Sequence, residues 1–220
     1  MPLELHPLTP ERLPDLDALF QARGCSVAKP CYCMYYRLSG SGVMAGGSDA
    51  AMRRNRTALA ALAHRAEQHG GPPPGLIGYD DSGTPVGWIS LGPREDFARL
   101  ARSRTMKAVD EQPVWSVICF VVPSAYRRQG LAHALLAGAL AWARERGVRL
   151  IEAYPVDRDV AGAPDASWFG SCSMFEKAGF TEVARHKPAR PIVRLALQPE
   201  DAPAARGCGD AGSSRRKARP

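Results

Sequence analysis

The sequence has no apolar run of membrane-spanning length, because charged residues or glycines interrupt every candidate segment. Its first residues, MPLELHPLTPERL, lack the basic stretch followed by an apolar stretch that marks a signal peptide. The six cysteines do not have the spacing of a disulfide framework, so we expect free thiols in a reducing compartment. These absences predict a cytoplasmic protein that does not act at a membrane.

Recognisable metal-binding and nucleic-acid-binding motifs are also missing. Cys31 and Cys33 form a Cys-x-Cys pair, but structural zinc sites use four ligands in recognisable pairs, and the five histidines lack ligand spacing. The net charge of +7 favours a polyanionic partner, which includes nucleic acid, a membrane surface or a phosphate-rich cofactor. The basic residues are scattered, however, and no aromatic-basic RNA motif occurs. We therefore expect neither a metal nor a nucleic acid.

The chain is long enough, at 220 residues, to bury a full core without disulfides or metals. Hydrophobic patterns predict helices at 9–24, 48–69 and 130–146, and a short one within 168–180. They predict strands at 3–8, 76–80, 86–92, 113–122, 148–156, 181–186 and 191–197. We expect residues 1–198 to form one domain, and residues 199–220, rich in Pro, Ala, Gly, Ser and Arg, to be a disordered basic tail.

This order of elements predicts an α/β (α+β) fold with a mixed, mostly antiparallel central sheet and helices on both faces. The strands between residues 76 and 122 are close enough in sequence to form an antiparallel meander. The helix at 130–146 then connects the strands at 113–122 and 148–156, which predicts a right-handed crossover between parallel neighbours.

The junction between the strand at 113–122 and the helix that follows, VVPSAYRRQGLAHALL (121–136), is unusual for a simple connector. The first turn of a helix exposes unpaired backbone N–H groups and carries the positive end of the helix dipole. Here that turn has Arg127, Arg128 and Gln129 but no acid, and Gly130 allows a ligand to approach the backbone. The pattern predicts an anion site of pyrophosphate size. The alternative is a solvated basic helix end.

The segment RRQGLA resembles the (Arg/Gln)-x-x-Gly-x-(Gly/Ala) signature of the GCN5-related N-acetyltransferases, the GNAT family. The preceding strand, the following helix, the next strand and the later MFEKAGF segment occur in the order typical of that family. The resemblance covers about residues 3–197 in element order and is strongest over 113–182. It implies a GNAT-like fold in which the strands at 113–122 and 148–156 splay apart, with acetyl-CoA as the acetyl donor.

The resemblance also implies where the donor binds. The strand from Cys119 onward would hydrogen-bond the pantetheine arm, and the helix end would hold the pyrophosphate. The cofactor-binding residues expected on this basis are Phe120, Val121, Val122, Arg127, Arg128, Gln129, Gly130, Leu131 and Ala132. The implied reaction is direct acetyl transfer to a primary amine of a small molecule or a protein. The alternative is a non-catalytic acyl-CoA-binding sensor or regulatory domain.

The catalytic residues are harder to assign. Many family members have a proton-donating tyrosine where this chain has Phe175, which has no proton to donate and favours the sensor alternative. Substitute donors are Tyr154 and the serines and cysteine at 171–173, of which Ser173 is the chosen candidate. Glu152, on an apolar strand at the expected splay, is the candidate base, and Asp157 is a weaker one. The alternative for Glu152 is a carboxylate paired with an arginine.

The acceptor site is expected in the stretch KPCYCMYYRL, between the first two helices, because this region commonly lines the acceptor pocket in the family. The candidate substrate-binding residues are Tyr32, Tyr35, Tyr36 and Arg37. The alternative is that these side chains anchor the loop to the core. The identity of the acceptor and the presence of a homodimer are left open.

Overall fold

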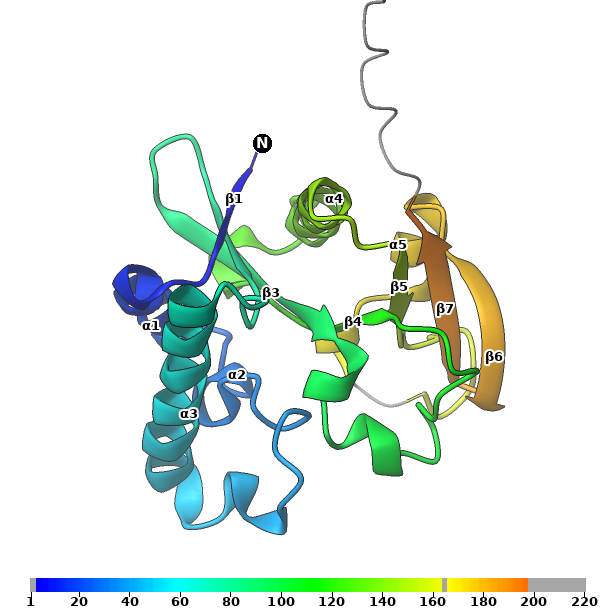
Figure 1. Cartoon of the computed structure of the whole chain (residues 1–220), viewed down its shortest axis with the longest axis horizontal. Helices are drawn as coiled ribbons and strands as arrows, with labels where there is room; N and C mark the ends of the chain where they lie inside the picture. Colours follow the sequence, from blue (N-terminus) through cyan, green and yellow to red (C-terminus); the bar gives the residue numbers. More distant parts are fainter. Residues whose placement is uncertain (1–2, 164–165, 198–220) are drawn as a thin grey trace, which may run out of the picture.

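The computed structural model describes residues 3–163 and 166–197, which share one seven-stranded sheet of order β1-β2-β3-β4-β5-β7-β6 (Figure 1). Parallel pairing joins β4 to β5, and the other neighbouring strands are antiparallel. The predicted mixed, mostly antiparallel sheet is confirmed. The strands are β1 (Glu4–Pro7), β2 (Leu76–Tyr79), β3 (Pro85–Pro93), β4 (Trp115–Val121), β5 (Leu150–Ala153), β6 (Thr181–Lys187) and β7 (Arg190–Ala196).

The α-helices are α1 (Leu13–Gln21), α2 (Ala28–Cys31), α3 (Gly47–His69), α4 (Leu131–Glu145) and α5 (Cys172–Lys177). Short 3-10 turns are η1 (Pro10–Arg12), η2 (Ser41–Met44), η3 (Arg94–Asp96), η4 (Leu100–Arg102), η5 (Ser124–Tyr126) and η6 (Ser167–Phe169). The helix predicted at 9–24 is therefore divided between η1 and α1, and the stretch at 25–47, predicted to be irregular, contains α2 and η2. The predicted tail at 199–220 lies outside the described residues.

Helices cover both faces of the sheet (Figure 1). On one face, apolar residues of α4 and α5, such as Leu135, Ala139 and Phe175, pack with residues of β3, β4 and β5. On the other face, α1, α2 and α3 pack over β2 and β3, with Phe20 and Trp88 at the centre. No helix in the described part of the chain is both long and apolar enough to cross a bilayer.

The parallel pairing of β4 and β5 is short. It runs from Trp115↔Ile151 to Val117↔Ala153 and then ends, although β4 continues to Val121. On the β3 side, Ser90 pairs with Cys119 and Leu91 with Val117, so Ile118 is an extra residue in β4. Such a bulge bends the strand that carries it. Beyond Val117, β4 has no β5 residue paired with it.

The segment after β5 moves away from β4, and a later segment lies between them. The N–H of Val156 donates to the carbonyl of Gly170 at 3.2 Å, and Val156 forms an isolated parallel bridge with Ser171. Phe169 is buried in a small core between β4 and β5, together with Ile118 and Tyr154. The two halves of the sheet therefore diverge around an apolar wedge instead of an empty gap.

Candidate functional site

The turn before α4 presents a row of backbone N–H groups. Gly130 is the N-cap of α4 with φ of 79°, and Arg128 has the uncommon φ of 62°. Within the described residues, the N–H groups of 128–130 have no protein acceptor, and the first-turn amides of α4 have none within the helix. A Cβ atom on Gly130 would meet nothing within 4 Å. This open, acid-free helix end fits a pyrophosphate group.

The side chains of Arg127 and Gln129 stabilise this turn. Arg127 donates from Nε to the carbonyl of Val122 at 2.9 Å and from Nη2 to the carbonyl of Gly24 at 2.5 Å. Gln129 donates from Nε2 to the carbonyl of Ala125 at 2.8 Å. Both side chains are thereby directed back to the protein backbone, so the turn offers an anion the backbone N–H groups of residues 128–130 and not these two side chains. The exposed side chain of Arg128 makes no such contact within the described residues.

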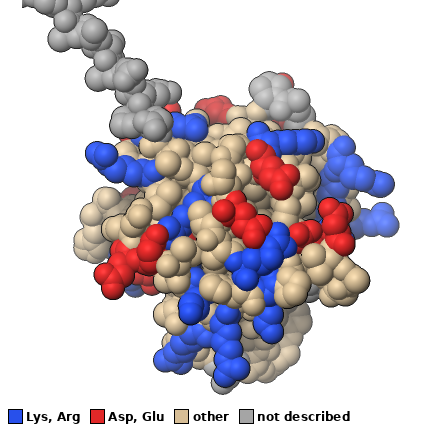
Figure 2. Space-filling view, turned by 90° about the vertical axis from the view of Figure 1, so that its right-hand side faces the viewer, with Lys and Arg blue, Asp and Glu red and all other residues tan. Residues whose placement is uncertain are grey.

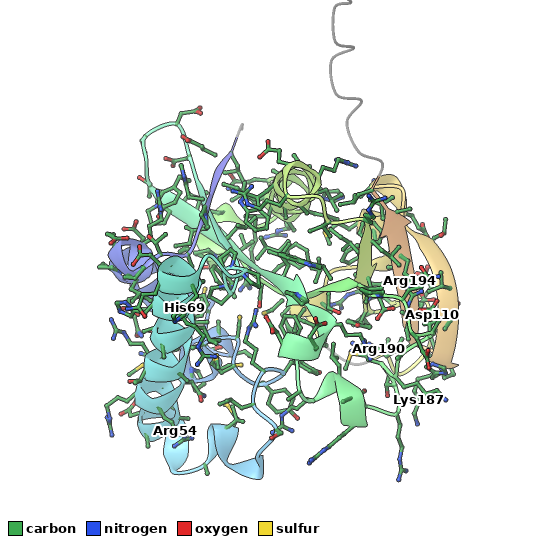
Figure 3. The ribbon with its side chains drawn as sticks, in the orientation of Figure 1. Arg54, His69, Asp110, Lys187, Arg190 and Arg194 are labelled. Atoms are coloured by element: carbon green, nitrogen blue, oxygen red, sulfur yellow. The ribbon has the colours of Figure 1, made fainter. Side chains whose placement is uncertain are left out.

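A buried charge network lies where β4, β5 and β7 meet. The Glu152 carboxylate is fully buried and accepts hydrogen bonds from Arg94 Nη1 at 2.9 Å and Arg194 Nε at 2.8 Å. Tyr154, also fully buried, donates its hydroxyl proton to Glu152 Oε1 at 2.5 Å. Arg194 also pairs with Asp110 through contacts of 2.6 and 3.0 Å, and these two side chains lie side by side in Figure 3.

This network has the arrangement of a structural ion cluster. Both carboxylate oxygens of Glu152 are held by guanidinium groups and neither reaches solvent, which is the Arg-paired alternative considered from the sequence. Tyr154 also bonds Ser116 Oγ at 3.0 Å and accepts from Arg94 Nη1, and burial raises its pKa well above the usual value. The geometry gives no support for Glu152 as a base or Tyr154 as a proton donor.

An open cavity of about 700 Å³ adjoins this network. Its lining comes from the segments 35–39, 99–106, 160–162 and 187–190. Four lining side chains are cationic and, among the described residues, none is acidic: Arg99, Arg102, Lys187 and Arg190. In Figure 2, Lys and Arg side chains gather in the lower part of the face formed by β6 and β7. Figure 3 places Lys187 and Arg190 at the lower end of these two strands.

Tyr36 lies at the base of this basic cavity. Its ring packs edge-on against Phe169 with a centroid distance of 5.7 Å, and its hydroxyl has no hydrogen-bond partner within the described residues. Cys119 of β4 packs in the same apolar cluster. Burial raises the pKa of Tyr36 to about 12, so the hydroxyl keeps its proton at neutral pH. Tyr35, beside it, is 40% exposed and stacks under Arg99.

Tyr32 and Arg37, the two other predicted substrate-binding residues, are both buried away from the cavity. Tyr32 donates its hydroxyl proton to Asp17 at 2.9 Å and packs against Phe20. Arg37 donates to the carbonyl of Pro74 at 3.0 Å and pairs with Asp96 at 3.5 Å. These contacts fix the loop to the core, which is the anchoring alternative considered from the sequence.

The comparisons with known proteins identify the family. The model of the acetyltransferase (GNAT) family matches residues 48–180. The chain belongs to the GNAT family. It is therefore an acetyltransferase, as the helix-end motif predicted, and its acceptor is unknown. A search among curated proteins found no match to the chain.

Solved structures share the fold at low sequence identity. A PaiA N-acetyltransferase from Thermoplasma acidophilum, crystallised in complex with coenzyme A, is 16% identical with a TM-score of 0.50, over 89% of this chain and 99% of that one. A GNAT acetyltransferase from Listeria monocytogenes is 10% identical with a TM-score of 0.52, over 89% and 95%. One from Streptococcus agalactiae is 12% identical with a TM-score of 0.52, over 89% and 96%. At this level of identity, the three structures show that the fold is shared and nothing further.

The remaining catalytic candidates of this acetyltransferase lie around α5. Ser171 caps the helix by accepting from the N–H of Met174 at 3.3 Å, and Ser173 Oγ lies 3.1 Å from Ser171 Oγ. Phe175 is fully buried against Phe120 and Phe180. None of these residues lines the basic cavity, so the geometry does not bring Ser173 to Tyr36.

Asp157 and the cysteines complete the set of candidates in the GNAT chain. Asp157 pairs with Arg185 at 2.8 Å, and this guanidinium holds the pKa of Asp157 below its usual value. The five described cysteines are free, and burial raises the pKa of Cys172 to about 11. Among the described residues no group of three or more His, Cys, Asp or Glu side chains could hold a metal ion.

Sequence reasoning missed the cationic lining of the cavity. Arg99 and Arg102 belong to the segment between β3 and β4, whereas Lys187 and Arg190 flank the β6–β7 turn, almost ninety positions later. Neither segment has a local motif. The one available signal was the absence of acids in the stretch 97–109 and in KPAR at 187–190.

The buried network predicts a large stability effect at Glu152. Replacing it by glutamine (Glu152→Gln) leaves the buried guanidinium groups of Arg94 and Arg194 without their shared carboxylate, which we expect to lower the free energy of unfolding by about 3–5 kcal/mol. Urea denaturation followed by circular dichroism measures this loss. Asp110→Asn is the matched control, because that carboxylate pairs with Arg194 at the exposed rim and its loss should matter much less. Equal losses in the two variants would contradict the structural role of Glu152.

Proposed function

We propose that this enzyme transfers the acetyl group of acetyl-CoA directly to a primary amine bound in the basic cavity. The observation that carries the proposal is the position of β4, which connects an open helix end to the cavity. Val121 ends the strand just before the pyrophosphate-sized turn, and Cys119, two residues earlier, packs against the same apolar cluster as Tyr36, which lines the cavity. Residues 1–198 would form the one acetyltransferase domain.

The donor site would combine the helix end with the unpaired edge of β4. The N–H groups of residues 128–132 would hold the pyrophosphate, since they lie at the positive end of the α4 dipole. Phe120, Val121 and Val122 would bind the pantetheine arm along the side of β4 that β5 has left. The coenzyme A complex of the PaiA enzyme supports this ligand class for the shared fold. When bound, acetyl-CoA supplies the thioester.

The cavity would favour the neutral, nucleophilic form of the bound amine. Direct transfer requires a neutral amine nucleophile, and a positive surrounding disfavours the ammonium form. Four cationic side chains and no described carboxylate line the cavity, so they lower the pKa of an amine that binds there. Water in the open cavity can then accept the released proton, and no dedicated carboxylate base such as Glu152 is needed.

Tyr36 would stabilise the leaving sulfur in place of the tyrosine that Phe175 replaces. The pKa of Tyr36, about 12, lies above the reference thiol pKa of about 8.5, so complete proton transfer to a thiolate is unfavourable. A hydrogen bond from the protonated hydroxyl to the developing negative charge has no such cost. The Tyr36 hydroxyl, which has no hydrogen-bond partner among the described residues, is suited to that role.

Thiol release from acetyl-CoA, measured with a panel of primary amines, tests the proposed reaction. Release that depends on the amine, with an N-acetylated product found by mass spectrometry, is the expected result. Tight coenzyme A binding without turnover of any amine would favour the sensor alternative instead.

The donor site predicts a specific effect at Gly130. A leucine there (Gly130→Leu) projects into the space left for the pyrophosphate, so the Kd for coenzyme A should rise about tenfold or more. Gly147→Leu is the matched control, because Gly147 follows the other end of α4, has φ of 71° and also has nothing within 4 Å of an added Cβ. Both variants carry similar backbone strain, about 1–2 kcal/mol. Calorimetric titration with coenzyme A should give a raised Kd for Gly130→Leu and a Kd close to that of the wild type for Gly147→Leu. An unchanged Kd in Gly130→Leu would refute the pyrophosphate site.

The role of Tyr36 predicts a selective loss of turnover. Removing its hydroxyl (Tyr36→Phe) should lower kcat about 10–100-fold with little change in KM, because a hydrogen bond to a charged group is lost only as the sulfur leaves. Tyr35→Phe is the control, since Tyr35 stacks with Arg99 at the cavity wall. Steady-state thiol release measures both variants. A wild-type kcat in Tyr36→Phe would exclude the hydroxyl from catalysis.

A further inference from the structure

The basic cavity contains a half-buried arginine, Arg190, whose surroundings differ from those of the arginines that pair with carboxylates. Arg37 pairs with Asp96, Arg94 with Glu152, Arg185 with Asp157 and Glu182, and Arg194 with Glu152 and Asp110. Arg190 is half-buried and has no carboxylate partner among the described residues. A sheltered charge without a counter-ion is costly, because burial removes its hydration.

The guanidinium of Arg190 is nevertheless held firmly. Its Nη2 donates to the carbonyl of Tyr154 at 3.1 Å, and its plane stacks over the ring of Phe169 at 4.0 Å. Its Nε is buried and has no hydrogen-bond partner in the described part of the chain. Burial without a compensating carboxylate lowers the pKa of Arg190 from its usual value. The group is therefore fixed, charged and short of an acceptor.

We propose that the amine acceptor also carries an anionic group, a carboxylate or a phosphate, and that Arg190 binds it. This inference rests on the proposed transferase function and names the class of its acceptor. Arginine is suited to this task, because its planar fork matches the oxygens of carboxylate and phosphate groups. The anion would supply the negative counter-charge that no described carboxylate provides to Arg190.

Three neighbouring cationic side chains add to the positive electrostatic potential of the cavity. Arg99 is held at the wall by hydrogen bonds to the carbonyls of Leu38 at 3.0 Å and Gly40 at 2.5 Å. Arg102 and Lys187 are exposed at the rim and have no carboxylate partner in the described residues. A cleft lined by one sign of charge attracts ligands of the opposite sign and raises their rate of association.

The geometry also favours a compact acceptor. Arg190 stacks on Phe169 at 4.0 Å from the ring centroid, and Tyr36 packs edge-on against the same ring at 5.7 Å. The proposed anion-binding group and the proposed catalytic hydroxyl therefore flank one aromatic side chain. A small molecule with its amine a few bonds from its anionic group reaches both places.

Matched acceptor pairs test this inference in the thiol-release assay. Each pair keeps the amine and removes the charge: an amino acid against its amide, and an aminoalkyl phosphate against the corresponding amino alcohol. We expect the charged member of at least one pair to have a kcat/KM about tenfold or more above its neutral counterpart. The two arms distinguish a carboxylate from a phosphate. Turnover in which neutral amines equal or exceed every charged partner would overturn the inference while leaving the transferase function intact.

Arg190→Met supplies the residue-level test. It keeps much of the apolar stem over Phe169 and should lower kcat/KM for the charged acceptor about 10–100-fold, with little effect on its neutral counterpart. Arg65→Met, on the exposed surface of α3, is the matched control. An equal loss for both acceptors would point to a packing defect and contradict the proposed contact. The rim variant Arg102→Met, which removes no buried contact, should selectively weaken the charged acceptor to a smaller extent.

A binding measurement keeps the inference testable without turnover. With coenzyme A at saturation to occupy the donor site, inorganic phosphate should raise the melting temperature of the wild type more than that of Arg190→Met. Identical shifts in the two proteins would contradict an anion site at Arg190. Loss of coenzyme A binding together with all turnover would instead count against the proposed transferase function.

Discussion

The short parallel ladder between β4 and β5 is the constraint on which the rest of the molecule depends. Only three residue pairs join these strands, and a bulge at Ile118 follows immediately. The buried carboxylate of Glu152 fixes the point at which the two strands diverge, because it binds Arg94 from the β3–β4 connection and Arg194 from β7. The β4 edge beyond Val117 is therefore left for a ligand that extends along the strand to the α4 helix end.

Two groups of arginines in this chain differ in their electrostatic surroundings. One group forms ion pairs that fix the fold: Arg37, Arg94, Arg185 and Arg194 each pair with a carboxylate. The other group lines the cavity and has no carboxylate within the described residues. In the proposed reaction this second group would have two effects, because it would favour a neutral amine and attract an anionic substituent of the acceptor.

The sequence was most informative where the signal is local. The apolar run at 113–122 and the acid-free turn before α4 can each be interpreted from neighbouring residues, and the family and the mixed sheet followed correctly. The strand predicted at 148–156 was too long, since β5 ends at Ala153 and Pro155 offers no N–H to continue a ladder.

Nearby tyrosines in CYCMYYR also differ in where their side chains lie, which the composition of the segment does not show. Tyr32 and Cys33 both adopt left-handed backbone angles, and the turn they form buries Tyr32 while Tyr36 reaches the cavity.

The chemistry at Glu152 and Arg190 was not predictable because the partners are distant in sequence. A glutamate on an apolar strand is compatible with a base or with an ion pair, and only the approach of residues 94 and 194 distinguishes them. For Arg190 the reverse holds, since its significance comes from the absence of a carboxylate partner among residues 3–163 and 166–197.

The central claim is that donor and acceptor meet beside β4, between the α4 helix end and the basic cavity. A crystal structure of the protein with coenzyme A tests it most directly. We expect the pyrophosphate on the N–H groups of residues 128–132 and the sulfur within hydrogen-bond distance of the Tyr36 hydroxyl. Coenzyme A bound elsewhere, or a sulfur directed away from Tyr36 and the cavity, would contradict it.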